Sequence, residues 1–182
     1  MILIFSTLYL MLPAYAANMT PVVAHRLNFL PRLARPVDGG LKLWGEYVFG
    51  TGKTWRGIIL GTIAAMFMGA IQFFLWQFNI IRLHSVINFA SVDPFFFGLL
   101  GGIGALGGDL LKSFCKRRFR IKSGQPWPLF DQLDFVIGYF AAISLVIAVN
   151  GTIILTGMGI TLIVHPLVNL IAYRLSLKRV WW

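Results

Sequence analysis

The chain has 182 residues, of which 58% are hydrophobic and only 12% are charged. Soluble domains carry about 25% charged residues, so this composition excludes an ordinary soluble globular protein. The mean hydropathy of +0.78 indicates that lipid surrounds most of the chain, while the net charge of +10 indicates anionic partners. The length fits one domain, and we expect a single membrane-embedded domain over residues 1–182.

Five apolar stretches are predicted to cross the membrane, because a helix needs about 20 apolar residues to span the hydrocarbon core. Their predicted bounds are 2–24, 57–79, 94–112, 131–149 and 152–173. Asp93-Pro94 is typical of a helix start. The turn pair Asn150-Gly151 divides a stretch without Asp, Glu, Lys or Arg that is too long for one crossing. The sequence therefore predicts an all-α integral membrane protein with five transmembrane helices.

The basic residues lie almost entirely on one side of these spans. All but one of the 16 Lys and Arg residues fall in the loops at about 25–56 and 112–130 or in the C-terminal tail, and the exception is Arg82. Short loops rich in Lys and Arg stay in the cytoplasm. The pattern thus predicts a multi-pass protein of the cell membrane, with its N-terminus outside and its C-terminus in the cytoplasm.

The first span has an alternative interpretation as a cleaved secretory signal. Ala14-Tyr15-Ala16 resembles a cleavage site. Signal peptides normally begin with basic residues, however, and none precedes the apolar stretch here. The net charge also has an alternative, which is nucleic-acid binding. Because the cations are confined to loops beside apolar spans, we expect anionic lipid or an anionic substrate at the membrane surface, and no nucleic acid.

Five of the six acidic residues are predicted within or close to the cytoplasmic face: Asp38, Glu46, Asp109, Asp131 and Asp134. Asp131 and Asp134 share one helical face, and Asp109 lies near the inner end of the preceding span. Three carboxylates beside many cations form a plausible Mg²⁺ site, with a polyphosphate bridging metal and cations. Alternatively, Asp131 and Asp134 are helix N-terminal charges that favour the dipole. Asp109 would then pair with Lys112 or Arg117.

A glycine-flanked cation precedes the second span, in the string Gly50-Thr51-Gly52-Lys53-Thr54-Trp55-Arg56-Gly57. It is not a Walker A motif, because Tyr47 stands where that motif needs its first glycine. Glycines still let backbone amides approach an anion, and the following helix adds a positive dipole. We expect a phosphate cradle here. The alternative is a flexible entry to the span, with Lys53 and Arg56 as topology anchors.

The stretch from Gly107 to Phe135 resembles the signature region of membrane enzymes that use CTP to make CDP-activated glycerolipids. The CDP-diacylglycerol synthases carry Ser-x-x-Lys-Arg-x4-Lys-Asp, followed later by Asp-Arg-x-Asp. The matching residues in this chain are Ser113, Lys116, Arg117, Lys122, Asp131 and Asp134.

Where the chain departs from that pattern, it resembles the archaeal branch, which is the CDP-archaeol synthase family. Ser123 replaces the Asp after Lys122, Gln132 replaces the Arg between the acids, and a His-Gly-Gly segment is missing. The residues Gly-Gln-Pro-Trp-Pro at 124–128 and the Pro36-x-Asp38-Gly39 element look like that branch as well.

This resemblance implies transfer of CMP from CTP to the phosphate of 2,3-bis-O-geranylgeranylglycerol 1-phosphate, with release of pyrophosphate. For that reaction we assign Mg²⁺ to Asp109, Asp131 and Asp134, and a further catalytic role to Lys116. The residues expected to bind CTP or the lipid phosphate are Gly50, Thr51, Gly52, Lys53, Thr54, Arg56, Ser113, Arg117 and Lys122.

Other functions remain open from the sequence. A small ion transporter or channel would carry charges near the centres of its spans, whereas these cluster at the inner ends. A scaffold protein has no need to gather acids and cations on one face. A polyprenol-type lipid kinase that uses CTP would transfer the γ-phosphoryl group and release CDP.

Overall fold

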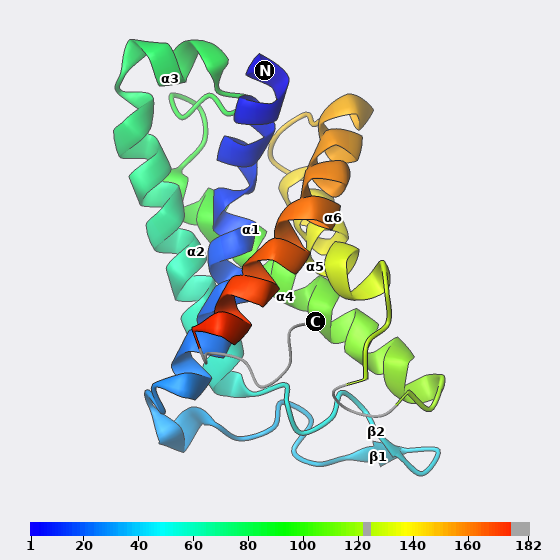
Figure 1. Ribbon diagram of the computed structural model, residues 1–182. Helices are drawn as coiled ribbons and strands as arrows, with labels where there is room; N and C mark the ends of the chain where they lie inside the picture. The colour runs from blue at the N-terminus through cyan, green and yellow to red at the C-terminus, as the bar shows by residue number, and fades with distance from the viewer. Residues whose placement is uncertain (122–124, 176–182) are drawn as a thin grey trace.

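The computed structural model describes residues 1–121 and 125–175 of the chain. Its elements in chain order are α1 (Ile2–Arg26), η1 (Pro31–Leu33), β1 (Lys42–Leu43), β2 (Glu46–Tyr47), α2 (Trp55–Trp76), α3 (Asn79–His84), α4 (Pro94–Arg118), α5 (Phe130–Ile143) and α6 (Gly151–Arg174). The long helices form a bundle, and the antiparallel pair β1–β2 lies beyond the end of the bundle opposite the N-terminus (Figure 1).

Four helices, α1, α2, α4 and α6, are long and apolar enough to cross a membrane. This supports the predicted integral membrane protein. The predicted span 131–149 is helical only to Ile143, since residues 144–147 form turns and a bend. Its 14 residues measure about 21 Å at roughly 1.5 Å per residue, short of the ~30 Å core. The hydroxyl of Ser144, the residue after α5, donates to the carbonyl oxygen of Phe140 at 2.7 Å, and such side-chain bonds compete with the backbone bonds of a helix.

Side-chain caps start three of the helices. Asp93 Oδ1 accepts a 2.7 Å hydrogen bond from the backbone N–H of Phe96 at the start of α4. Asn150 Oδ1 accepts one of 2.9 Å from Ile153 at the start of α6. The predicted helix start at Asp93-Pro94 is thus confirmed, and α6 begins within the predicted turn pair Asn150-Gly151. Thr54 caps α2, because its hydroxyl oxygen accepts from the N–H of Gly57.

The helices α4 and α5 pack backbone against backbone. A Cβ atom added to Gly104 would lie 2.5 Å from the carbonyl oxygen of Gly138, and one added to Gly108 would collide with the carbonyl oxygen of Asp134. Small residues permit such close approach, and close packing is what associates helices in lipid. The contact also aligns the two helices so that Asp109, next to Gly108, lies level with the start of α5.

The helix α1 belongs to the core of the bundle. Leu10, Met11 and Ala14 are fully buried. The hydroxyl of Tyr139, from α5, donates to the carbonyl oxygen of Leu10. Gln72 of α2 likewise donates to the carbonyl oxygen of Tyr9, so hydrogen bonds from two neighbouring helices hold α1 near its middle.

Candidate active site

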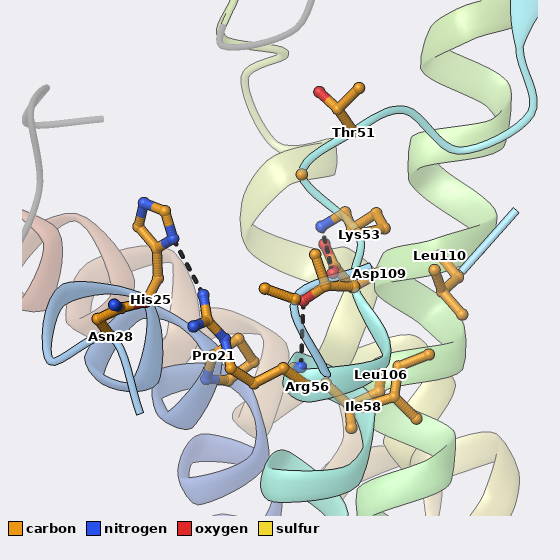
Figure 2. A pocket seen from close by; sticks show the side chains of 14 residues that line it. Pro21, His25, Asn28, Thr51, Lys53, Arg56, Ile58, Leu106, Asp109 and Leu110 are labelled. Carbon is orange, nitrogen blue, oxygen red and sulfur yellow. Dashed lines mark hydrogen bonds and ion pairs between the residues drawn. The ribbon is translucent and has the colours of Figure 1, made fainter. Parts of the chain in front are cut away.

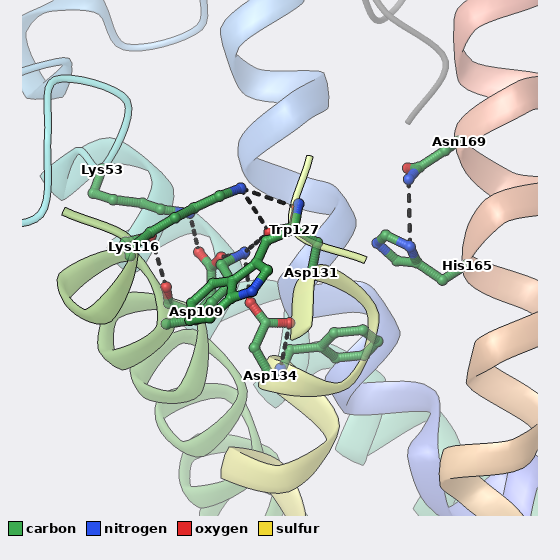
Figure 3. A network of polar contacts seen from close by, with 11 residues as sticks. Lys53, Asp109, Lys116, Trp127, Asp131, Asp134, His165 and Asn169 are labelled. Atoms are coloured by element: carbon green, nitrogen blue, oxygen red, sulfur yellow. Dashed lines mark hydrogen bonds and ion pairs between the residues drawn. The ribbon is translucent and has the colours of Figure 1, made fainter. Parts of the chain in front are cut away.

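Lys112, on α4, lies at the centre of a cluster of carboxylates. Its Nζ atom is 3.1 Å from Asp109 Oδ1, 3.1 Å from Asp131 Oδ1 and 2.7 Å from Asp134 Oδ2. Asp109 comes from α4, and the other two acids come from the first turns of α5 (Figure 3). The three carboxylates assigned to Mg²⁺ from the sequence thus lie together, with an ammonium group between them.

Two further lysines complete this cluster. Lys53, from the loop before α2, forms an ion pair with Asp109 Oδ2. Lys116 Nζ is 3.0 Å from each carboxylate oxygen of Asp131. A buried charge is costly unless it is paired. Three carboxylates face three ammonium groups, so the formal charges of the cluster balance. We call these six residues the acid–lysine cluster: Lys53, Asp109, Lys112, Lys116, Asp131 and Asp134.

Backbone amides fix the two acids of α5. Asp131 Oδ2 accepts a 2.6 Å hydrogen bond from the N–H of Trp127, and Asp134 Oδ1 accepts one of 2.7 Å from the N–H of Phe135. The Trp127 ring stacks on Phe130 with centroids 4.3 Å apart. Trp127 therefore belongs to the turn that presents Asp131, and its ring already has an aromatic partner.

A cavity of about 390 Å³ adjoins the cluster and shares Lys53 and Asp109 with it (Figure 2). Its walls come from the end of α1, the loop of residues 36–54 before α2, which we call the glycine-rich loop, the start of α2 and the middle of α4. Its polar lining residues are His25, Asn28, Thr51, Lys53, Thr54, Arg56 and Asp109. Gly52 lines it as well, so five of the predicted phosphate-binding residues surround one space.

Sequence reasoning missed His25 and Asn28 on this cavity. Arg56, only 4% exposed, contacts His25 Nδ1 at 3.2 Å and donates to the carbonyl oxygen of Phe29 at 3.2 Å. Asn28 has a positive φ of 47°, a conformation in which Asn is enriched. The preference of Asn for turns just after a helix is the feature of the sequence that could have pointed to Asn28. Arg56 therefore holds the turn after α1 while it lines the cavity.

Asp38 shapes the loop that carries Lys53. Its carboxylate accepts hydrogen bonds from the backbone N–H groups of Phe49 at 2.8 Å, Gly40 at 3.0 Å and Gly50 at 3.2 Å. Burial raises the pKa of Asp38, but these amides outweigh burial and hold the pKa below its usual range. The N–H of Gly50, expected to face an anion, is thus bonded to Asp38. This residue organises the loop from inside.

The remaining predicted phosphate ligands lie on or after α4. The Ser113 hydroxyl donates to the carbonyl oxygen of Asp109 at 2.8 Å and is bonded within its own helix. The Nε atom of Arg117 lies 3.8 Å from the position of a Cβ on Gly50, so this side chain reaches the glycine-rich loop. Lys122 lies outside the described residues.

Arg118 was not singled out from the sequence, yet it anchors the β-hairpin. Its guanidinium donates to the carbonyl oxygens of Leu43 at 2.5 Å and Tyr47 at 2.7 Å. It also lies over the ring of Trp44, 5.4 Å from the centroid. The end of α4 is thereby fixed to the loop that leads to Lys53.

Comparisons with known proteins agree along the whole chain. The CarS-like family model, described as CDP-archaeol synthase, matches residues 1–182. The CDP-archaeol synthase of Methanocaldococcus jannaschii is 38% identical and covers 99% of this chain and 98% of the relative. That of Aeropyrum pernix is 36% identical and covers 98% and 92%.

A solved structure agrees as well. It is described as an intramembrane enzyme for archaeal membrane lipids biosynthesis, and it superposes with a TM-score of 0.74 at 33% identity, covering 91% of this chain and 94% of that one. Full-length sequence similarity and shared architecture lead to one conclusion: the chain belongs to the CDP-archaeol synthase family.

Proposed function

We propose that this protein transfers CMP from CTP to the phosphate of 2,3-bis-O-geranylgeranylglycerol 1-phosphate, giving the CDP-lipid and pyrophosphate. One observation carries the proposal: in a chain that matches the CDP-archaeol synthase family over its full length, a polar cavity shares Lys53 and Asp109 with the acid–lysine cluster. The cavity offers a place for a polyphosphate directly beside the carboxylates.

The residues suit this chemistry because the reaction needs charge neutralisation and alignment more than a base. The nucleophile is a phosphate oxygen that is largely ionised near neutral pH, since the second pKa of a phosphate monoester is about 6. The nucleophile, the attacked phosphorus and the leaving pyrophosphate all carry negative charge. Cations close to one another around one cavity meet that need.

We propose that the phosphates of CTP bind along the cavity wall. The phosphate of the lipid would meet them at the inner end of α4. The residues assigned to CTP are Gly50, Thr51, Gly52, Lys53, Thr54 and Arg56. Those assigned to both phosphates are Ser113, Lys116, Arg117 and Lys122. The pairing of Lys53 with Asp109 supports this division, because it marks where the cavity meets the acid–lysine cluster.

We assign Mg²⁺ to the carboxylates of Asp109, Asp131 and Asp134. Their oxygens are the donor type that Mg²⁺ prefers, at about 2.1 Å from the metal. In the described residues these acids surround Lys112 Nζ instead, and no group of three His, Cys, Asp or Glu side chains is already arranged as a metal site. By the type of its donor atoms, although not by their present arrangement, this set of carboxylates fits Mg²⁺. When bound, the ion would supply charge neutralisation at the phosphates.

We further propose five crossings of the cell membrane, with the acid–lysine cluster facing the cytoplasm. The apolar residues 145–149, which follow α5, would supply the rest of the length that the fifth crossing needs. Cys115 is the single cysteine of the chain and is exposed near the end of α4. A membrane-impermeant maleimide should label it in inverted vesicles and not in intact cells. Exposed Ser91, before α4, gives the reverse control as Ser91→Cys in a Cys115→Ser background.

The activity is tested with purified protein, the lipid phosphate and CTP labelled at the α-phosphorus, followed by thin-layer chromatography. A cytidylyltransferase places the label in the lipid. With CTP labelled at the γ-phosphorus, label in the lipid would instead show a kinase, and an unlabelled lipid in both assays would overturn the proposal.

A further inference from the structure

Lys112 differs from the other lysines of the acid–lysine cluster in how many carboxylates it contacts. Lys53 and Lys116 each form ion pairs with one acid, Asp109 and Asp131 respectively. Lys112 Nζ contacts Asp109, Asp131 and Asp134 at once, at 2.7–3.1 Å. It is therefore the residue through which the acid of α4 and the acids of α5 are joined.

A metal bound by the three acids would have to lie among the same carboxylate oxygens that now surround Lys112 Nζ. Two cations cannot share it, because like charges a few ångströms apart in a partly buried site repel each other strongly. The side chain of Lys112 is only 13% exposed. Its flexible four-carbon stem allows the ammonium to move while the helix stays in place.

The charge balance gives a direction to this exchange. Three lysines already neutralise the three carboxylates, so a divalent cation entering alone would leave the site with two excess positive charges. The phosphates of a nucleoside triphosphate supply the missing negative charge. They would also give the displaced ammonium of Lys112 a new partner. Asp109, one of its present partners, lies on the cavity wall, so phosphates bound in the cavity would be close to this ammonium.

We propose that Lys112 is a positioning residue that holds the place of the divalent cation until the nucleotide arrives, and then moves onto the nucleotide phosphates. The metal consequently binds weakly without CTP and tightly with it. This inference rests on the proposed function for the identity of the nucleotide and of the metal.

The test measures Mn²⁺ binding to the purified full-length protein by electron paramagnetic resonance, without CTP and without lipid. Lys112→Met keeps the length of the side chain and removes its charge. We expect it to tighten nucleotide-free Mn²⁺ binding about tenfold, a usual size for coupling between two ligands. Addition of CTP should then tighten Mn²⁺ binding strongly in the wild type and little in the variant.

Lys42→Met is the matched control. Lys42 lies on β1 with its ammonium over the ring of Tyr47, outside the acid–lysine cluster, so this variant loses the same charge without freeing a carboxylate. We expect its Mn²⁺ binding to equal that of the wild type. An equal tightening in this control would show a general effect of net charge and would overturn the proposal.

Lys112→Met leaves three acids facing two lysines, and this imbalance can prevent folding. A second comparison, between Asp134→Asn and the double variant Lys112→Met/Asp134→Asn, avoids this imbalance. In the double variant two acids face two lysines. The two proteins share their carboxylates and differ only at Lys112. Tighter nucleotide-free binding in the double variant supports the proposal, and equal or weaker binding overturns it. The labelled-CTP assay on the wild type decides the proposed function separately, because the nucleotide-free Mn²⁺ measurement uses neither substrate.

Discussion

Lys53 and Asp109, which are 56 positions apart in the sequence, form the ion pair that joins the glycine-rich loop to the middle of α4. The same two residues line the cavity. A change at Lys53 therefore acts on both parts of the proposed site: it removes a cation from the cavity wall and leaves one oxygen of Asp109 without its partner.

Lys53→Met should raise the KM for CTP by about ten- to a hundredfold, because a charge-assisted contact to phosphate is lost. The measurement is the steady-state rate of lipid labelling over a range of CTP concentrations. Lys42→Met serves as control, since Lys42 is on the hairpin and contacts Tyr47. An unchanged KM for CTP would remove Lys53 from the nucleotide site.

Asp131→Asn and Asp134→Asn should each lower turnover by at least about a hundredfold if the carboxylates hold the metal and align the phosphates. Asp134 is the more buried, with a side chain 4% exposed against 25% for Asp131. Asp134→Asn should therefore also lower the melting temperature, while Asp131→Asn should change it little.

Glu46→Gln is the control for these two variants, because Glu46 is an exposed acid on β2. It loses a carboxylate without touching the acid–lysine cluster and should keep full activity. Near-normal turnover in both aspartate variants would contradict the metal assignment, whatever their stability.

The sequence predicted much of the fold where local chemistry decides it. The starts of α4 and α6 follow from Asp93 and Asn150, whose side chains cap their own helices within three residues. The place of Lys112 could not be predicted in the same way. Whether Asp109 pairs with Lys112 alone, or shares it with α5, depends on how closely α4 and α5 approach.

That approach is set by contacts between residues distant in the sequence. A glycine in a membrane helix favours close packing in general, but only the structure shows that Gly108 lies against the carbonyl of Asp134. The same holds for Asp38, whose three amide partners come from a loop folded back on itself. Candidate site residues and the local pair Asp109–Lys112 were therefore predictable from the sequence, whereas partners that lie far apart in the sequence were not.

Gly108→Ala tests whether this helix contact positions the site. A methyl group there would collide with the carbonyl oxygen of Asp134, and overpacking of this kind costs about 1–3 kcal/mol. We expect a lower melting temperature together with a loss of lipid labelling, because α5 must move away from α4 and carry Asp134 with it.

Gly107→Ala is the matched control, one residue earlier on the same helix. Its added methyl group would meet no atom within 4 Å, and alanine favours a helix more than glycine does. We expect activity and melting temperature at or above those of the wild type. Equal damage from both substitutions would mean that helix propensity or backbone freedom matters here, and not the contact with Asp134.

Asp38 predicts how the glycine-rich loop responds to pH. Because the backbone amides of Phe49, Gly40 and Gly50 hold the pKa of Asp38 below its usual range, the stabilisation that they give is present above the unfolded pKa of about 3.9. It is lost as the pH falls through the lower folded pKa. Between pH 5 and 8 the loop should therefore be equally resistant to limited proteolysis, and resistance should fall only in stronger acid.

Asp38→Asn removes the charge and one acceptor oxygen at every pH, so the loop should be cleaved faster already at pH 7. Lys53 lies at the end of this loop, and its carbonyl oxygen accepts from the N–H of Val37 at 2.9 Å. The KM for CTP should therefore rise several-fold, while the melting temperature of the helical bundle changes little. Glu46→Gln again supplies the control, as an acid of the same loop with an exposed side chain. Proteolysis rates for Asp38→Asn equal to those of the wild type would show that the three amides do not order the loop.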